Sequence, residues 1–211
     1  MTPSCRIVVF AKAPVAGYAK TRLIPALGAA GAAGLARRLL DHAVQQALAA
    51  GLGPVELCAA PDTQHPALKA LASGGQVALS AQGEGDLGDR MARAFVRGLA
   101  DGRSAAASTE GPCMLLIGTD APGVDAAYLR AAAAALATHD AVFGPALDGG
   151  YTLVGLRQPT PALFAQMPWS TPQVMGETRK RLAHLGLRHA ELPALSDIDE
   201  PADLAALPPG W

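Results

Sequence analysis

Apolar residues along this chain fall into two alternating kinds of segment. Short apolar runs rich in β-branched residues predict buried strands at residues 6–11, 55–59, 77–80, 114–118, 141–144, 152–155 and 187–192. Longer segments, several of them rich in Ala, predict helices at residues 29–50, 65–73, 89–100, 125–137 and 172–185, with a short one after Pro201. Gly51 is placed to end the first helix. Residues 101–112, rich in Ala, Ser and Gly, are typical of a surface connection.

This alternation predicts an α/β sandwich with a mostly parallel central sheet, built as one domain over residues 1–211. Ligands of such sheets bind at the carboxyl ends of the strands. The unusual loops of this chain all follow predicted strands, at residues 12–25, 82–88, 119–123 and 145–151. We therefore look for the functional site in these four loops.

Composition excludes several classes of protein. Half of the 211 residues are hydrophobic and 17% are charged, which excludes a disordered chain. The formal charge of −1 argues against a general nucleic-acid binder, which would carry a basic excess. Aromatic residues make up only 4%, too few for a platform that stacks single-stranded bases.

Three widely spaced cysteines, Cys5, Cys58 and Cys113, form neither a CxxC motif nor a cluster with histidine. We expect them to be buried thiols, with no zinc site and no disulfide framework. No apolar run reaches the length of a membrane span, and the N-terminus lacks the pattern of a signal peptide. We expect a cytoplasmic protein without a membrane partner, as a monomer or a homodimer.

Charge is distributed unevenly along the chain. Residues 1–40 carry six basic residues and no acid, whereas residues 191–211 carry five acids and no base. We expect the two ends to fold together into a site for a polyanion, such as a nucleoside triphosphate, held by basic groups and a divalent metal. Arg37 and Arg38 are the exceptions, because they are expected to solvate a helix face.

Three loops carry residues suited to that chemistry. In the first loop, Gly17 lets backbone amides approach a phosphate, and Lys20 and Arg22 supply positive charge. The loop lacks the spacing of a Walker A motif. Asp120 follows the most apolar predicted strand directly, where a metal ligand would be useful, and Asp125 is better placed to cap the next helix.

The acidic segment 197–203, which lies outside the four loops after the strands, is the third candidate. Asp199 or Glu200 is expected to cap a short helix that has Pro201 at its first position. One cap does not account for four acids within seven residues. The remaining acids are therefore available for a ligand.

Several sequence blocks together resemble a known family. They are Phe10-Ala11-Lys12-Ala13-Pro14, Gly17, Lys20-Thr21-Arg22-Leu23, Gly85-Asp86-Leu87-Gly88-Asp89-Arg90-Met91, Gly118-Thr119-Asp120-Ala121-Pro122, Gly144-Pro145-Ala146-Leu147-Asp148-Gly149-Gly150-Tyr151, Trp169-Ser170-Thr171 and Asp197-Ile198-Asp199. In this order they resemble the CofC-like transferases, also labelled rSAM/selenodomain-associated transferase 1 or arsenosugar-biosynthesis glycosyltransferase. That family is similar to the nucleotide-diphospho-sugar transferase superfamily, so the resemblance implies a GT-A-like, Rossmann-like fold.

The resemblance also implies roles for individual residues. Lys20 and Arg22 would act on the phosphates, and Asp120 and Asp199 would hold Mg²⁺ or Mn²⁺, with Asp197 as the alternative second ligand. The implied nucleotide-binding residues are Lys12, Gly17, Gln82, Gly88 and Arg90, and the implied acceptor side consists of Asp148, Gly149, Gly150, Tyr151 and Trp169. Two features depart from relatives: the first loop is shorter than the glycine-rich loop of sugar pyrophosphorylases, and Gly-Thr-Asp replaces the Asp-x-Asp of many glycosyltransferases.

Two kinds of transfer are compatible with these residues. In nucleotidyl transfer, a phosphorylated or phosphonate acceptor attacks a nucleoside triphosphate and pyrophosphate leaves, a reaction that needs positioning and charge neutralisation. In glycosyl transfer from a UDP- or GDP-sugar, Asp148 is the candidate base. The Lys-x-Arg loop and the lone central aspartate favour nucleotidyl transfer, whereas the family's usual label favours glycosyl transfer. A nucleotide-binding protein without turnover is the third possibility.

The remaining candidates have simpler explanations. Trp169 is expected either to pack in the core, with Ser170 or Thr171 capping the next helix, or to wall the acceptor pocket. Tyr151 is compatible with core packing or with a hydrogen bond to the acceptor. The histidines show no metal-binding spacing, so we expect them in surface or capping positions.

Overall fold

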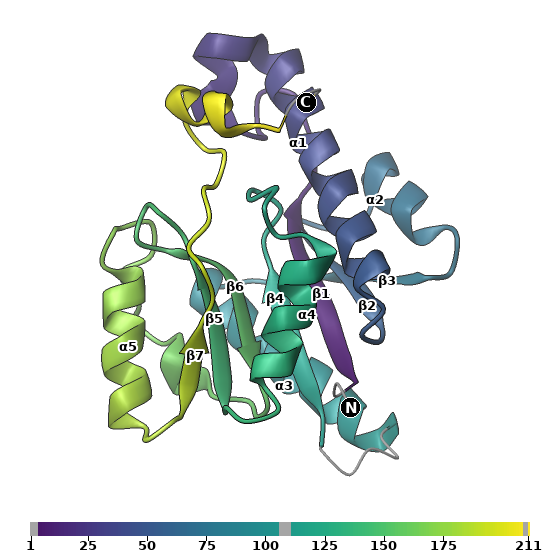
Figure 1. The fold of residues 1–211 in the computed structure, drawn as a ribbon. Coiled ribbons are helices and arrows are strands. Elements are labelled where there is room, and N and C mark those ends of the chain that lie inside the picture. Colours follow the sequence, from purple (N-terminus) through teal and green to yellow (C-terminus); the bar gives the residue numbers. More distant parts are fainter. Residues whose placement is uncertain (1–3, 106–110, 209–210) are drawn as a thin grey trace.

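A computed structural model describes residues 4–105, 111–208 and 211, and it contains one seven-stranded sheet of order β3-β2-β1-β4-β6-β5-β7 (Figure 1). The strands are β1 (Cys5–Lys12), β2 (Val55–Ala60), β3 (Val77–Ala81), β4 (Cys113–Ile117), β5 (Ala141–Pro145), β6 (Tyr151–Leu156) and β7 (His189–Glu191). Within this sheet β6 runs antiparallel to β4 and β5, and the other pairings are parallel. The predicted α/β sandwich with a mostly parallel sheet is therefore confirmed.

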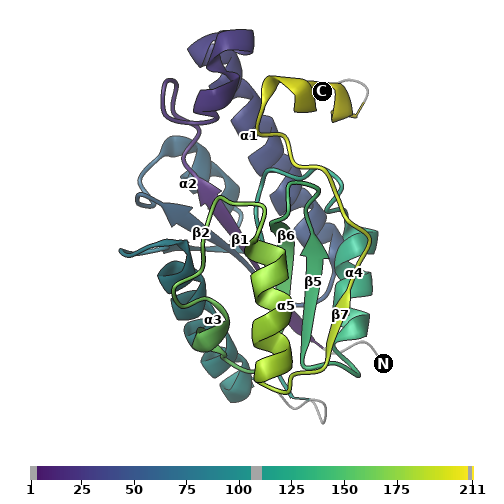
Figure 2. The same ribbon diagram turned by 90° about the vertical axis from the view of Figure 1, so that its left-hand side faces the viewer.

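Helices cover both faces of the sheet. The helices are α1 (Ile24–Ala50), α2 (Pro66–Ala72), α3 (Leu87–Ala105), α4 (Ala126–Ala135) and α5 (Val174–His184), with short 3₁₀ helices η1 (Thr21–Leu23), η2 (Pro161–Leu163) and η3 (Pro201–Ala206). One hydrophobic cluster joins the sheet to α1, α2 and α4, and a second joins its other face to α3 and α5. Figure 2 shows helices on both sides of the sheet. Three layers follow from this division.

Alternation along β1 shows why the strands form. Cys5, Ile7 and Val9 point into the first cluster, and Val8 and Phe10 point into the second. Successive side chains of a strand point to opposite faces, so a strand covered by helices on both sides is apolar throughout. The three cysteines are free and buried, as the sequence predicted.

The C-terminal segment packs on the start of α1. Ile198 is fully buried in a third cluster with Leu23, Leu35 and Leu39, against which Leu204 and Trp211 also pack. Figure 1 shows this yellow segment running beside the purple start of α1. The two ends of the sequence therefore meet above the carboxyl edge of the sheet, as their opposite charges predicted.

Local details differ from the sequence predictions at several points. Gly28 interrupts α1 with φ 69° and ψ 164°, so the predicted start at residue 29 is the start of its regular part. α3 continues to Ala105, which overturns the expected connection over 101–105, and residues 106–110 lie outside the described residues. The N-cap residue of α5 is Gln173 and not the predicted Ser170 or Thr171, although Thr171 Oγ1 accepts a hydrogen bond of 3.4 Å from the N–H of Gln173.

Three capping predictions are confirmed. Asp125 caps α4 by accepting a hydrogen bond from the backbone N–H of Tyr128 at 2.7 Å. Glu200 caps η3 in a capping box with Asp203, and Pro201 is the first residue of that helix. His65 caps α2. Asp120 is therefore not needed as the cap of α4.

One helix, Thr21–Ala50, is long and apolar enough to cross a membrane by length and composition alone. A core helix of a globular protein satisfies the same criterion. In the structure Leu39, Leu40 and Val44 of this helix are buried, and Arg37 and Asp41 form an ion pair within it.

Candidate active site

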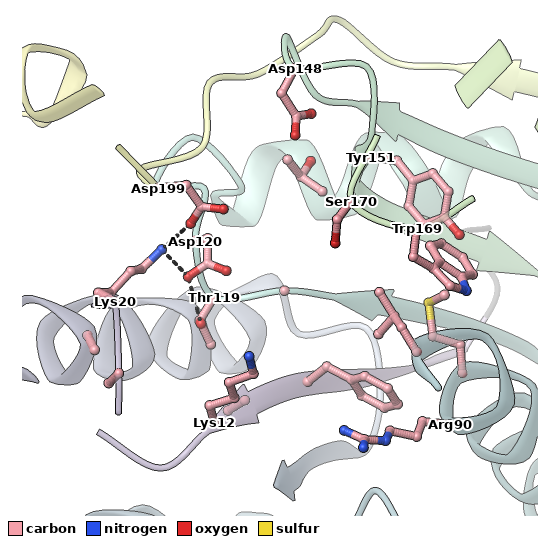
Figure 3. A pocket seen from close by; sticks show the side chains of 18 of the residues that line it. Lys12, Lys20, Arg90, Thr119, Asp120, Asp148, Tyr151, Trp169, Ser170 and Asp199 are labelled. Carbon is pink, nitrogen blue, oxygen red and sulfur yellow. Dashed lines mark hydrogen bonds and ion pairs between the residues drawn. The ribbon is translucent and has the colours of Figure 1, made fainter. Parts of the chain in front are cut away.

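A pocket of about 770 Å³ lies at the carboxyl edge of the sheet (Figure 3). Because β1, β3, β4 and β5 are parallel, the loops that follow them emerge at the same edge. Ten of the predicted site residues line this pocket, namely Lys12, Lys20, Arg22, Gln82, Arg90, Asp120, Asp148, Tyr151, Trp169 and Asp199. The fold thus brings together residues that the sequence separates by up to 187 positions (199 − 12).

Lys20 lies between two acidic residues that line the pocket, Asp120 and Asp199. Its Nζ lies 2.5 Å from Asp120 Oδ1 and 2.7 Å from Asp199 Oδ1, and it donates to the carbonyl oxygen of Ile198 at 2.6 Å. Only 8% of its side chain is exposed. Burial acts to lower the pKa of Lys20, but the charges of Asp120 and Asp199 and the hydrogen bonds to them raise it above its ordinary value.

The backbone brings the two acids to one point. Asp120 follows β4, and Asp199 lies on the segment that returns over the sheet after β7. The N–H of Ile198 donates to the carbonyl oxygen of Asp120 at 2.9 Å, which fixes one segment on the other. The N–H of Asp199 donates to Asp203 Oδ2 at 3.0 Å, so the partner of Glu200 in the capping box of η3 also orients Asp199.

The donor set at this point fits a hard divalent cation. Asp120 and Asp199 direct one carboxylate oxygen each to a common centre, and both side chains are nearly half exposed. No group of three or more His, Cys, Asp or Glu side chains able to hold a metal occurs among the residues that the structure describes. Mg²⁺ commonly takes one or two protein carboxylates and completes its shell with waters and substrate phosphates. Asp120 and Asp199 supply two carboxylates at this pocket, which is within the number that Mg²⁺ commonly takes from a protein.

Further cations line the same pocket. Arg22 is 65% exposed and lies 3.7 Å from Glu200, a pair that contributes little in water. Arg90 is held by a bond of 2.9 Å from its Nε to the carbonyl oxygen of Gly85. Lys12 ends β1 with an exposed side chain. These residues supply positive charge along the length of the pocket.

Gln82 is buried where β1, β2 and β3 end. Its Nε2 donates to the carbonyl oxygens of Ala11 at 3.3 Å and Cys58 at 3.1 Å. Both amide hydrogens are therefore used by the sheet. Its Oε1 is the atom that this side chain can offer to a hydrogen-bond donor on a ligand.

The acceptor side contains two aromatic rings in contact. Tyr151 and Trp169 meet edge to face with centroids 6.3 Å apart, and Tyr151 also packs on Phe143. Both rings line the pocket, yet Tyr151 Oη and Trp169 Nε1 are buried and have no hydrogen-bond partner among the described residues. Burial raises the pKa of Tyr151, so its hydroxyl stays protonated. Tyr151 and Trp169 therefore pack against the hydrophobic core and also form part of the pocket wall.

Asp148 lies on the turn between β5 and β6. One of its oxygens accepts a hydrogen bond from the N–H of Gly150 at 2.8 Å, and the side chain is exposed toward the pocket (Figure 3). Asp197 shares its electrostatic environment. Burial, followed by the charges of Asp148, Asp199 and Asp120, raises the pKa of Asp197 to about 6.

Four predicted glycines, Gly17, Gly88, Gly149 and Gly150, are not among the residues that line the pocket. A Cβ on Gly88 would collide with the carbonyl oxygen of Phe164 and would lie 3.1 Å from the Trp169 ring. A Cβ on Gly149, whose φ is +93°, would collide with the carbonyl oxygen of Pro172. These two glycines position the pocket wall through close packing.

Sequence reasoning missed several lining residues. Tyr18 is 81% exposed at the pocket, and Thr21, Thr119 and Ser170 also line it. Ser170 has a φ of +61°, which is uncommon for a residue with a side chain. These four residues lie in the sequence blocks around Gly17, Asp120 and Trp169, and that position could have identified them as candidates. Nothing in the composition of those blocks distinguished pocket from surface.

Comparison with solved structures supports the fold. A protein from Desulfovibrio desulfuricans, assigned as a nucleotide-diphospho-sugar transferase, is 31% identical, with 94% of this chain and 83% of that chain covered at a TM-score of 0.83. The 4-diphosphocytidyl-2C-methyl-D-erythritol synthase of Anaerococcus prevotii is 9% identical, with coverages of 96% and 94% and a TM-score of 0.58.

Glucosyl-3-phosphoglycerate synthase of Mycobacterium tuberculosis, solved with Mn²⁺, UDP and glucosyl-3-phosphoglycerate, is 10% identical. It matches 97% of this chain and 75% of its own at a TM-score of 0.57. The likeness to these distant proteins concerns the GT-A-like fold.

No curated protein matches this chain in sequence. Residues 43–171 match a family described as an uncharacterized protein conserved in bacteria, DUF2064. That match covers more than half of the chain and includes Gln82, Asp120 and Asp148 from the pocket. The chain therefore belongs to the DUF2064 family.

Proposed function

We propose that this protein is a divalent-cation-dependent nucleotidyltransferase that joins a nucleoside monophosphate unit to a small phosphorylated or phosphonate acceptor. The observation that carries the proposal is the convergence of Lys20, Asp120 and Asp199 in a pocket that several more cations line. A triphosphate carries concentrated negative charge, and its transfer depends mainly on neutralisation and alignment. This pocket offers both.

Asp120 and Asp199 would hold the divalent cation. When bound, the cation supplies charge neutralisation to the phosphates and orients them for displacement. The donor chemistry of the two carboxylates supports this assignment, and Mg²⁺ or Mn²⁺ is the expected ion.

Side chains of the chain itself would bind the phosphates. Arg22 is exposed and can form a bidentate contact with phosphate oxygens. Lys12 and Arg90 would bind further along the same wall, and Gln82 would accept a hydrogen bond from the nucleotide through Oε1. Gly17 shapes the loop that carries Lys20, with a φ of +84° that favours glycine.

The reaction requires no nucleophile from the protein. An ionised acceptor oxygen attacks the α-phosphorus of the triphosphate, a new oxygen–phosphorus bond forms, and the bond to the β-phosphate oxygen breaks as pyrophosphate leaves. The protein orients the acceptor, with Tyr151 and Trp169 as an apolar wall and the turn of Asp148, Gly149 and Gly150 at the rim. Because a phosphate oxygen is already ionised at neutral pH, no general base is needed.

Glycosyl transfer is the second candidate. It is favoured by the 31% identity with the relative assigned as a nucleotide-diphospho-sugar transferase and by the exposed carboxylate of Asp148. In that reaction a hydroxyl acceptor needs a base, and Asp148 would take its proton. The sequence blocks also support a finer assignment to the CofC-like group within the family.

The deciding experiment compares donors directly. The purified chain is tested against the four nucleoside triphosphates and against UDP- and GDP-sugars, with Mg²⁺, with Mn²⁺ or with EDTA, in the presence of phosphorylated acceptors. Metal-dependent release of pyrophosphate from one triphosphate supports nucleotidyl transfer, and release of a nucleoside diphosphate from a sugar donor supports glycosyl transfer. Binding without release of either product refutes both and indicates a nucleotide-binding protein.

Asp120→Asn tests the assigned residues. It should abolish turnover while circular dichroism and the melting temperature stay close to those of the wild type. Asp125→Asn is the matched control, because Asp125 follows the same strand but caps α4. Full activity of Asp120→Asn in the presence of EDTA would refute the cation assignment.

A further inference from the structure

Lys20 occupies the position between two carboxylates that a divalent cation would need. An ammonium group has three N–H donors, and here three oxygen atoms lie within 2.7 Å of it. They belong to Asp120, Asp199 and the backbone of Ile198, and only 8% of the Lys20 side chain is exposed. Lys20 therefore has no donor left for a phosphate while it holds this position (Figure 3).

We propose that Lys20 is the resident cation of this carboxylate pair, and that a divalent cation binds Asp120 and Asp199 only when the Lys20 ammonium leaves. The proposal rests on the proposed function only in taking these two acids as the cation ligands. Mg²⁺ and Mn²⁺ need carboxylate oxygens at little more than about 2 Å. An ammonium between the same two oxygens blocks that approach and repels the ion.

The local backbone restricts the form of such an exchange. Lys20 has φ 48° and ψ 47°, a left-handed conformation that is uncommon for residues other than glycine, asparagine and aspartate. Residues 15–18 are exposed, whereas Ala19 directly before Lys20 and Leu23 after it are buried. The backbone on both sides of Lys20 is therefore held by core packing. The proposed exchange would consist of a rotation of the Lys20 side chain, without movement of this backbone.

The exchange would link the cation to the anionic ligand. A released Lys20 ammonium remains on the pocket wall beside Arg22, where it can bind a phosphate. An anion that binds released Lys20 favours cation binding, and by linkage the cation favours anion binding to the same extent. The free cation alone should then bind weakly, because it must first displace an internal ion pair.

Binding of Mn²⁺ alone to the full-length chain, followed by the electron paramagnetic resonance signal of free Mn²⁺, tests this competition without any turnover. Lys20→Met should bind Mn²⁺ at least about tenfold more tightly than the wild type, because the competing charge is gone. Lys12→Met is the matched control, since it removes one lysine charge from the same pocket and has no ion pair with either acid among the described contacts. Its affinity should change by less than about threefold, through screened long-range charge only.

Equal Mn²⁺ affinities of Lys20→Met and Lys12→Met would overturn the competition. Loss of tight binding in the double variant Lys20→Met, Asp120→Asn would confirm that the measured site is this one. These outcomes are separate from the proposed function, because turnover in the donor panel can succeed when the competition fails, and the reverse also holds.

A second measurement uses the wild type, so its result does not depend on whether the Lys20→Met variant folds correctly. Amine-specific labelling followed by mass spectrometry should find Lys20 protected in EDTA and labelled roughly fivefold faster in saturating Mn²⁺, because its ammonium is released to solvent. Lys69 and Lys180, which are exposed and do not line the pocket, serve as internal references and should not change. Unchanged protection of Lys20 in saturating Mn²⁺ would overturn the proposal.

Discussion

The backbone N–H of Ile198 donates a hydrogen bond of 2.9 Å to the carbonyl oxygen of Asp120. This bond joins the turn after the central strand β4 to the segment that follows the edge strand β7. The Ile198 side chain is fully buried beneath α1, so the same residue anchors the segment to the core. The position of Asp199 beside Asp120 therefore depends on the packing of its neighbour.

Ile198→Ala should lower both stability and cation affinity. Removing a fully buried isoleucine side chain beyond Cβ typically costs about 2–5 kcal/mol of the free energy of unfolding. The loosened segment should also weaken Mn²⁺ binding, because Asp199 is no longer held beside Asp120. Urea denaturation and Mn²⁺ titration measure the two effects. Ile198→Val should recover most of both, and a variant that loses stability but keeps full Mn²⁺ affinity would argue against this anchoring role.

Gly88→Ala should disturb the pocket wall. The added Cβ would collide with the backbone of Phe164 and press on Trp169, so the α3 start and the 164–169 segment must separate. We expect a loss of about 1–3 kcal/mol in the free energy of unfolding and a shift in tryptophan fluorescence, which only Trp169 and Trp211 produce.

Gly34→Ala is the matched control for that change. Gly34 is exposed within α1, and a Cβ there meets no atom within 4 Å. The substitution should raise stability by about 0.5–1 kcal/mol, because alanine favours a helix over glycine. Equal responses at the two positions would show that close packing at Gly88 is not what requires glycine there.

Glu56→Ala should destabilise the fold through a buried ion-pair network. Glu56 is 3% exposed, lies 3.2 Å from Arg6, pairs with Arg97 and accepts from Ser80 at 2.5 Å. Removing the buried carboxylate takes one partner each from Arg6, Arg97 and Ser80, and breaking a buried pair of this kind typically costs about 3–5 kcal/mol. Chemical denaturation measures the loss. Arg179→Ala, which breaks the more exposed pair with Glu191, should cost less than about 1 kcal/mol.

Asp197→Asn should stabilise the cation-free protein in a pH-dependent way. The folded state raises the pKa of Asp197 from 3.8 to about 6, so it binds this proton more tightly than the unfolded chain does. Ionised Asp197 therefore opposes folding above pH 6, and this penalty disappears as the pH falls below the unfolded value. The difference in melting temperature between variant and wild type should be largest at pH 7–8 and should vanish near pH 3.5. A difference independent of pH would contradict this explanation.

The amino-acid sequence by itself determined the elements and much of the site. Apolar runs such as β1 and β4 fix buried strands because both faces of a covered sheet must be apolar. The loops that follow parallel strands meet at one edge, so the sequence also predicted that Asp120, Asp148 and the first loop lie together. The opposite charges of the two chain ends predicted the pairing that places Lys20 beside Asp199.

Tertiary structure alone decided the strand order, the packing glycines and the partner of each charge. The insertion of antiparallel β6 between β4 and β5 depends on which apolar faces match across the whole sheet, and no local pattern carries that choice. In the sequence, Gly88 cannot be distinguished from a glycine of a phosphate-binding loop. In the structure it packs close to Trp169, which lies far from it along the chain. The sequence indicates only that Lys20 is a cation in a loop. In the folded chain it is buried among three oxygen atoms, and because a buried charge must be paired, the ion pair is its most favourable state.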